Sequence, residues 1–115
     1  MTPEAVRAWL DAYVAAWRSY GGIRDLFTAD AEYRYHPYDE PLRGRDAIAA
    51  DWLSDRDEPG SWEARYEPLL VDGDRAVASG ETRYAAGRTF SNLFVLAFDG
   101  EGRCRSFTEW YVEHP

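Results

Sequence analysis

Hydrophobic residues recur at three- and four-residue spacing from the start of the chain, at Val6, Trp9, Leu10, Tyr13, Val14 and Trp17. This spacing makes one apolar stripe along a helix. Thr2, Pro3 and Glu4 supply a capping hydroxyl, a first-turn proline and a carboxylate at the positive end of the helix dipole. The pattern predicts a long N-terminal helix that ends at Gly21-Gly22.

Two shorter helices are expected on either side of an early strand. Residues 23–27 continue the helical spacing briefly and predict a second helix that stops near residues 28–30. Residues 31–36 alternate like a strand, which Pro37 breaks. A third helix follows Gly44, and its inner side is formed by Ile48, Ala49, Trp52 and Leu53.

From Trp62 onward the period of the apolar positions changes to two, which is typical of strands. Turn signals divide this half into strands at residues 62–71, 75–84, 89–98 and 103–112. Pro68 favours an edge position or a bulge in the first of these. The order predicts an α+β fold: three helices interleaved with one strand, then a four-strand antiparallel meander.

The strand expected at residues 89–98 is apolar on both faces, with Phe90, Phe94, Leu96 and Phe98 on one and Leu93 and Val95 on the other. A sheet that is buried on both faces needs two covers, and the helices supply only one. We therefore expect a homodimer packed through its sheets. The alternative is that the C-terminal strand curls over part of this face.

Composition narrows the expected class. A chain of 115 residues is long enough for one domain with a single core. The formal charge of −8 and the lack of a Lys/Arg run argue against binding to nucleic acid or to an anionic membrane. The N-terminus lacks the features of a signal peptide, and no apolar run approaches the roughly 20 residues of a membrane span. The expected location is the cytoplasm.

The inventory of metal ligands is small and that of aromatic residues is large. Cys104 is the single cysteine and there are two histidines, so a four-ligand zinc site is hard to assemble and we expect no metal. Five Trp, eight Tyr and five Phe supply large buried area together with ring edges that can line a ligand cavity.

Three segments in order resemble the nuclear transport factor 2-like superfamily, and within it the SnoaL-like branch. They are residues 26–33 (LFTADAEY), 41–48 (PLRGRDAI) and 102–115 (GRCRSFTEWYVEHP). The resemblance implies one domain over residues 1–115, with a cone-shaped, curved antiparallel sheet wrapped around the first helix and a pocket at one end. Members include steroid isomerases, polyketide cyclases, dehydratases and epoxide hydrolases, which need no cofactor, and proteins that only bind ligands or dimerise.

The resemblance also locates the catalytic positions of the steroid isomerases. Their general base falls on Tyr35 by count, or on His36 when the base–proline pair is matched to His36-Pro37. Tyr13 corresponds to their oxyanion-binding tyrosine, and Phe94 stands where they carry a second oxyanion acid. Because neither Tyr35 nor His36 is a carboxylate, we do not expect a typical steroid isomerase.

The late strands offer carboxylates in place of that base. Following the resemblance, the pocket face receives Ser79, Glu81, Arg83, Asn92, Phe107, Glu109 and Tyr111. Glu81 and Glu109 are the candidate bases, because aromatic walls would desolvate a carboxylate and raise its pKa. Tyr35 and His36 are further catalytic candidates. The expected ligand contacts are Tyr13, Trp17, Tyr33, Trp52, Asn92, Phe94, Phe107 and Tyr111.

Other interpretations of these residues stay open. Glu81 can pair with Arg83 in a purely structural network. Alternation does not say which strand face looks inward, so Glu109 can also face solvent or a dimer contact. His36 can be a hydrogen-bonded residue at a strand end.

We expect a pocket for a small, largely apolar carbonyl- or hydroxyl-bearing molecule, with cofactor-independent isomerase, cyclase or dehydratase chemistry. The alternatives are non-catalytic binding of such a ligand and a dimerisation module, because a widespread fold leaves function open. The sequence does not identify the substrate.

Overall fold

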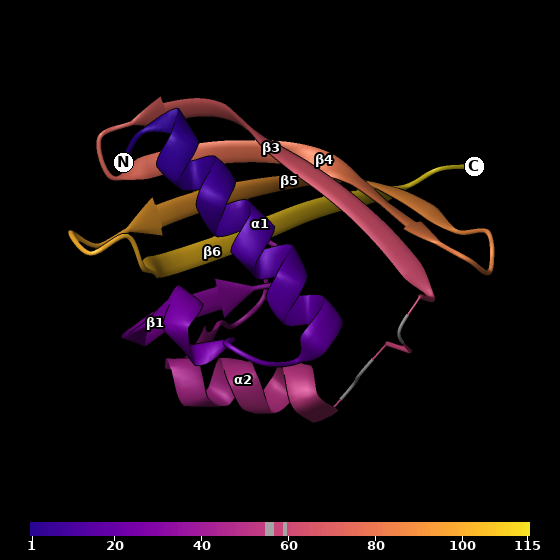
Figure 1. Ribbon diagram of the computed structural model, residues 1–115, viewed down its shortest axis with the longest axis horizontal. Helices are drawn as coiled ribbons and strands as arrows, with labels where there is room; N and C mark the ends of the chain where they lie inside the picture. The colour runs from indigo at the N-terminus through magenta and orange to yellow at the C-terminus, as the bar shows by residue number, and fades with distance from the viewer. Residues whose placement is uncertain (55–56, 59) are drawn as a thin grey trace.

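The computed structural model describes residues 1–54, 57–58 and 60–115. The predicted long helix is present as α1 (Pro3–Ser19), with Thr2 as its N-cap accepting a hydrogen bond from the backbone N–H of Ala5 at 3.1 Å. The helix ends at Tyr20, whose φ of 56° is left-handed and whose N–H bonds back to Ala16. Of the stripe foreseen from the spacing, Val6, Trp9, Leu10 and Tyr13 are buried, and Val14 and Trp17 are partly buried. The helix lies across one face of the sheet (Figure 1).

The prediction of three helices is wrong: the described residues form two α-helices, α1 and α2 (Arg45–Ser54). The expected second helix is a single 3₁₀ turn, η1 (Arg24–Leu26), because the next residue already pairs with Cys104 in the sheet. Strand β1 (Phe27–Arg34) therefore starts four residues earlier than the alternation suggested.

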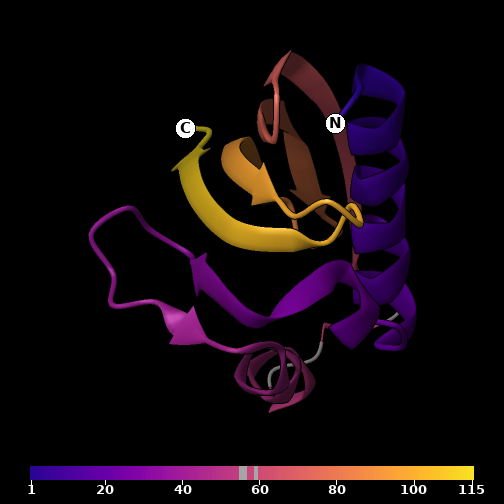
Figure 2. The ribbon, with the colours of Figure 1, turned by 90° about the vertical axis from the view of Figure 1, so that its left-hand side faces the viewer.

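The sheet has six strands, in the order β2-β1-β6-β5-β4-β3, and is curved and unclosed (Figure 2). The members not yet given are β2 (Leu42–Arg43), β3 (Trp62–Asp72), β4 (Arg75–Tyr84), β5 (Thr89–Phe98) and β6 (Cys104–Glu113). A four-strand antiparallel meander is thus an incorrect description of the sheet. β1 adds to it beside β6 and runs parallel to β6, so the sheet is mixed.

The prediction for Pro68 is confirmed in both of its forms. Strand β3 lies at the edge of the sheet, and its pairing with β4 shifts register between Pro68 and Leu70. A proline has no N–H to donate, so it is tolerated where the ladder is interrupted or unpaired.

The core lies between α1 and the inner face of the sheet. Trp9 packs edge-on against Phe27 and Phe98, while Tyr33 stacks on Phe107 with ring centroids 4.3 Å apart. Aromatic pairs of this kind add stabilisation beyond the area they bury. No helix among the described residues is long and apolar enough to cross a membrane.

The outer face of the sheet keeps apolar side chains in solvent. Leu93 and Val95 are 36% and 38% exposed, as the two-faced pattern of β5 implied. β6 pairs with β5 along its length, so it lies beside β5 and does not cover this face. The homodimer stays a prediction.

Candidate functional site

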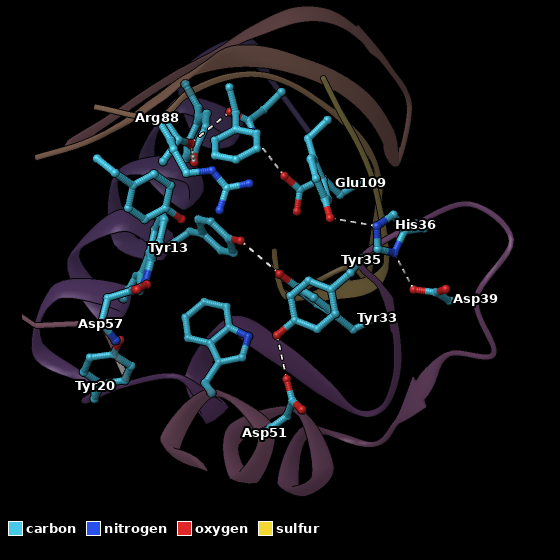
Figure 3. A pocket seen from close by; sticks show the side chains of 18 residues that line it. Tyr13, Tyr20, Tyr33, Tyr35, His36, Asp39, Asp51, Asp57, Arg88 and Glu109 are labelled. Atoms are coloured by element: carbon cyan, nitrogen blue, oxygen red, sulfur yellow. Dashed lines mark hydrogen bonds and ion pairs between the residues drawn. The ribbon is translucent and has the colours of Figure 1, made fainter. Parts of the chain in front are cut away.

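A cavity of about 590 Å³ opens between α1, the end of β1 with its following loop, α2 and the inner faces of β3 to β6. Ten of its described lining residues are Trp, Tyr or Phe, and four are Asp or Glu. Its walls are therefore largely aromatic, with carboxylates set among the rings (Figure 3).

Glu109 points into this cavity from β6 (Figure 3). Burial raises the pKa of its carboxyl to about 7, although the hydrogen bond from Asn92 and the nearby His36 act in the opposite direction. Asn92 Nδ2 donates to the carboxylate at 2.7 Å. Near neutral pH the Glu109 side chain is thus divided between its acid and base forms, which suits proton transfer.

Glu109 stands at the end of a directed hydrogen-bond chain that crosses four strands. Thr82 Oγ1 donates to Asn92 Oδ1 at 2.9 Å, so it must accept the proton of Tyr66, whose hydroxyl is 2.6 Å away. The chain thus runs Tyr66, Thr82, Asn92, Glu109. The side-chain amide of Asn92 therefore donates to the Glu109 carboxylate in a fixed direction and holds the carboxylate in place.

Tyr13 from α1 and Tyr33 from β1 bring their hydroxyls together at 2.9 Å (Figure 3). Burial raises the pKa of both phenols well above the usual value, so both keep their protons. One hydroxyl donates to the other, and the proton of the accepting hydroxyl can be donated to a ligand. Trp52 of α2 packs edge-on against Tyr13 at 5.1 Å and supports this pair.

The wall at the end of β1 carries further polar pairs. His36 lies between Asp39 and Tyr111, with its ring nitrogens at 2.9 Å and 2.8 Å from their oxygens. Tyr35 donates to Asp51 of α2 at 2.6 Å. These bonds join the loop after β1 to β6 and to α2.

The opposite wall is formed by α1 and by the turn between β4 and β5. Trp17 Nε1 donates to Asp57 at 3.0 Å. Arg88 makes a bidentate pair with Glu113 and lies 5.0 Å from the centroid of the Phe90 ring.

The structure brings together nine of the residues predicted for the site. Those that line the cavity are Tyr13, Trp17, Tyr33, Tyr35, His36, Trp52, Asn92, Glu109 and Tyr111. Phe94 and Phe107 are buried beneath it, where they pack against Tyr13 at 5.8 Å and 5.4 Å. They belong to the core, and the prediction that they form part of the lining is wrong.

The placement of Glu81 on the pocket face is also wrong. Its carboxylate pairs with Arg83, which holds its pKa below the usual value, and both residues lie outside the cavity lining. Thr82 and Tyr84 face the cavity in their place. Because strand side chains alternate, choosing the wrong face of β4 moved the whole set by one residue.

Nine described lining residues escaped the sequence analysis: Tyr20, Asp39, Asp51, Asp57, Tyr66, Thr82, Tyr84, Arg88 and Phe90. Thr82 and Tyr84 would have followed from the opposite choice of face on β4, whereas no face of β3 was assigned to the pocket. Asp51 and Asp57 carried no signal, because acidic residues in a helix and a loop are usually solvated. Within residues 1–54, 57–58 and 60–115, no group of three His, Cys, Asp or Glu side chains could hold a metal ion.

The sequence profile of the SnoaL-like domain matches residues 6–107. The chain belongs to the SnoaL-like family. This places it in the nuclear transport factor 2-like superfamily, as the three sequence segments suggested.

Two solved structures resemble this SnoaL-like chain in fold. A nuclear transport factor 2-like protein of unknown function from Burkholderia xenovorans LB400 has a TM-score of 0.74 and 21% identity, covering 97% of this chain and 88% of its own. A candidate ketosteroid isomerase from Kribbella flavida DSM 17836 has a TM-score of 0.75 and 20% identity, covering 98% of this chain and 82% of its own. At these identities the likeness concerns the fold.

Proposed function

We propose that this SnoaL-like protein is a cofactor-independent acid–base catalyst that removes a proton next to the carbonyl of a small, largely apolar ketone. Glu109 is the base in this proposal, and the Tyr13–Tyr33 pair binds the oxygen on which negative charge develops. The observation that carries it is a buried carboxylate with a pKa raised to about 7, facing an aromatic cavity.

The polar groups match the needs of such a reaction. Proton abstraction next to a carbonyl requires a base near neutrality and a donor for the developing oxyanion. Glu109 supplies the base. The Tyr13–Tyr33 hydroxyl pair supplies the donor, which stays protonated because burial raises the pKa of both phenols. The name of the Kribbella flavida relative, a candidate ketosteroid isomerase, points to the same class of chemistry. The base here comes from β6 and not from the end of β1.

Non-catalytic binding and a dimerisation module are the rival functions. A pure binding site is expected to pair its carboxylates fully, whereas the hydrogen bond to Glu109 within the described part of the chain comes from the neutral Asn92. A pure interaction module is expected to fill its cavity with side chains, whereas about 590 Å³ is open here. Both observations favour catalysis.

The test follows deuterium uptake at the α-carbons of 2-tetralone, a two-ring ketone, in D₂O by proton NMR. We expect the wild type to accelerate uptake, with a rate that rises as pH increases through about 7 because the ionised Glu109 is the base. Glu109→Gln should lower the rate by about 10²-fold or more, the usual contribution of a positioned base.

Glu81→Gln is the matched control, since Glu81 lies outside the cavity. Its rate should equal that of the wild type. Unchanged exchange in Glu109→Gln, or no acceleration by the wild type, would contradict the proposed function.

We further infer that the protein forms a homodimer packed through its outer sheet face. Leu93 of β5 lies opposite Trp110 of β6, and Val95 lies opposite Val77 of β4. Trp110 is 41% exposed. Neighbouring strands thus present one apolar surface on the side away from α1.

A further inference from the structure

Asp39, His36 and Tyr111 form a hydrogen-bonded chain along one wall of the cavity. Figure 3 labels His36 and Asp39 at this wall. Asp39 Oδ2 lies 2.9 Å from His36 Nδ1, and His36 Nε2 lies 2.8 Å from the hydroxyl of Tyr111. All three residues line the cavity. They are separate from the hydrogen-bond chain of Tyr66, Thr82 and Asn92 that ends at Glu109.

The local structure fixes this arrangement. The turn that contains Pro37 folds back so that the N–H of Asp39 donates to the carbonyl of His36 at 3.1 Å. The ring of Tyr38 stacks on the imidazole at 5.0 Å with an interplanar angle of 18°. The His36 ring is therefore held at both nitrogens and on one face, and its orientation toward Tyr111 is set.

We propose that Tyr111 is a catalytic proton donor to a second oxygen of the substrate, and that His36 and Asp39 position and reprotonate it. This inference deepens the proposed function and rests on it. Glu109 and Tyr111 are two residues apart on β6, so they project from the same strand face, roughly 7 Å apart along the strand. A base and an acid thus face one cavity, and the substrate class they fit is a ketone with an oxygen on its β-carbon.

The state of His36 decides which proton Tyr111 offers. The Asp39 carboxylate accepts from Nδ1–H, so a neutral imidazole accepts the Tyr111 proton at Nε2. A charged imidazolium donates Nε2–H to the Tyr111 oxygen, which frees the Tyr111 hydrogen for the cavity. The side chains of His36 and Asp39 are 34% and 32% exposed, so the imidazole can exchange protons with water.

With a β-hydroxy ketone the step is balanced. Glu109 takes the proton from the carbon between the carbonyl and the hydroxyl-bearing carbon, and the electrons of that C–H bond form a C=C bond. The C–O bond breaks, and the hydroxyl leaves as water with the proton of Tyr111. His36 Nε2 reprotonates Tyr111, Glu109 returns its proton to solvent, and the neutral His36 takes up one proton from solvent to restore the starting state. The net change is loss of water without oxidation or reduction.

The groups that face His36 determine how the rates of proton exchange and elimination should depend on pH. Asp39 and Tyr38 face it from its own loop, and Tyr111 faces it from β6. Glu109, also on β6, interacts with it electrostatically, and His36 lowers the pKa of that carboxyl. Loss of His36 should therefore shift the exchange profile to higher pH, so the exchange rates are compared well above the Glu109 pKa of about 7, where that carboxyl is ionised in every variant. There, exchange should depend on Glu109, whereas elimination should depend on His36 as well.

The experiment uses 4-hydroxy-4-phenylbutan-2-one as the probe and measures two rates. Deuterium uptake at C3 reports the base, and formation of the conjugated enone, followed by its ultraviolet absorbance, reports elimination. Tyr111→Phe should lower elimination by about 10²-fold while exchange stays within about twofold. His36→Gln and Asp39→Asn should each lower elimination by about tenfold and change its pH profile, again with exchange preserved.

Val112→Ala is the matched control, because Val112 is the next residue of β6 and is exposed on the other face. It should leave both rates unchanged. Equal losses of exchange and elimination in Tyr111→Phe would overturn the proposal, as would unchanged elimination or a wild type that exchanges but never eliminates.

A substrate-free measurement separates this inference from the proposed function. Nitrogen-15 NMR of the imidazole should show the Nδ1–H tautomer for neutral His36 in the wild type, and Asp39→Asn should abolish that preference. A wild type that exchanges nothing contradicts the proposed function. If neutral His36 carries its proton on Nε2, the proposed role of His36 and Asp39 toward Tyr111 is overturned, whatever the exchange result.

Discussion

Glu109 makes stability depend on pH, because burial raises the pKa of its carboxyl from 4.5 to about 7. The folded state binds the Glu109 proton more tightly than the unfolded state does. The stabilisation is complete below pH 4.5 and is lost as pH rises through about 7. At 1.36 kcal/mol per pKa unit, we expect the free energy of unfolding to fall by up to about 3 kcal/mol over this window.

Glu109→Gln should remove this contribution, so urea melts between pH 4.5 and pH 8 should show a flatter profile than the wild type. Glu67→Gln changes an exposed glutamate of β3 and serves as the control with an unchanged profile. If Glu109→Gln and the wild type lose stability in parallel over the window, Glu109 is not a buried carboxyl in solution.

At the same scale, the sequence predicted nine residues of the cavity lining but not which face of β4 points inward. Glu109 and Glu81 both lie on strands whose side chains alternate between the two faces, and the sequence favoured neither as the base. The structure turns Glu109 toward the cavity and Glu81 toward Arg83. Alternation gives the relative faces within a strand, but the inward face depends on packing against α1, which is a contact between distant segments.

Gly80 of β4 lies opposite Tyr66 of β3. A Cβ at this glycine would collide with the Arg65 carbonyl oxygen and with the backbone and ring of Tyr66. Gly80→Ala should therefore push the strands apart and lower the free energy of unfolding by about 1–3 kcal/mol, the usual cost of overpacking. It should also disturb the Tyr66–Thr82 hydrogen bond that begins the chain to Glu109.

Chemical denaturation of Gly80→Ala checks this, with Gly100→Ala as the control because a Cβ at Gly100 would meet no atom within 4 Å. Gly80→Ala with wild-type stability would show that β3 and β4 can separate without cost, against the packing described here.

Element boundaries were predictable where the pattern is local, and pairing was not. The turn glycines and the period of two located β3 to β6 within two residues. The parallel pairing of β1 with β6 joins residues more than 70 positions apart, for example Tyr33 and Phe107, and no local pattern contains it. The same pairing explains why the expected second helix is only η1.

At the scale of the whole molecule, the outer face of the sheet is an apolar surface that the helices of the described residues do not cover. On the outer face, Leu93, Val95 and Trp110 are 36%, 38% and 41% exposed, and Val112 is 69% exposed. Leu70 of β3 extends the surface to the sheet edge, since it pairs with Val77 and is 64% exposed. A second copy packed on this surface would remove these side chains from water, and a stable interface buries about 800 Å² on each partner.

We expect sedimentation equilibrium to give twice the mass of the 115-residue chain. Leu93→Lys should shift the protein to monomers, because it places an unpaired charge beside Trp110 at the centre of the apolar surface. Leu53→Lys makes the same change of charge on α2, away from the sheet face, and should stay dimeric. A wild type that is monomeric at high concentration, or a Leu93→Lys variant that sediments with the wild type, would show that the outer face is not the dimer contact. Since the cavity lies on the opposite side of the sheet, Leu93→Lys should keep the exchange activity of the Glu109 site while losing the partner.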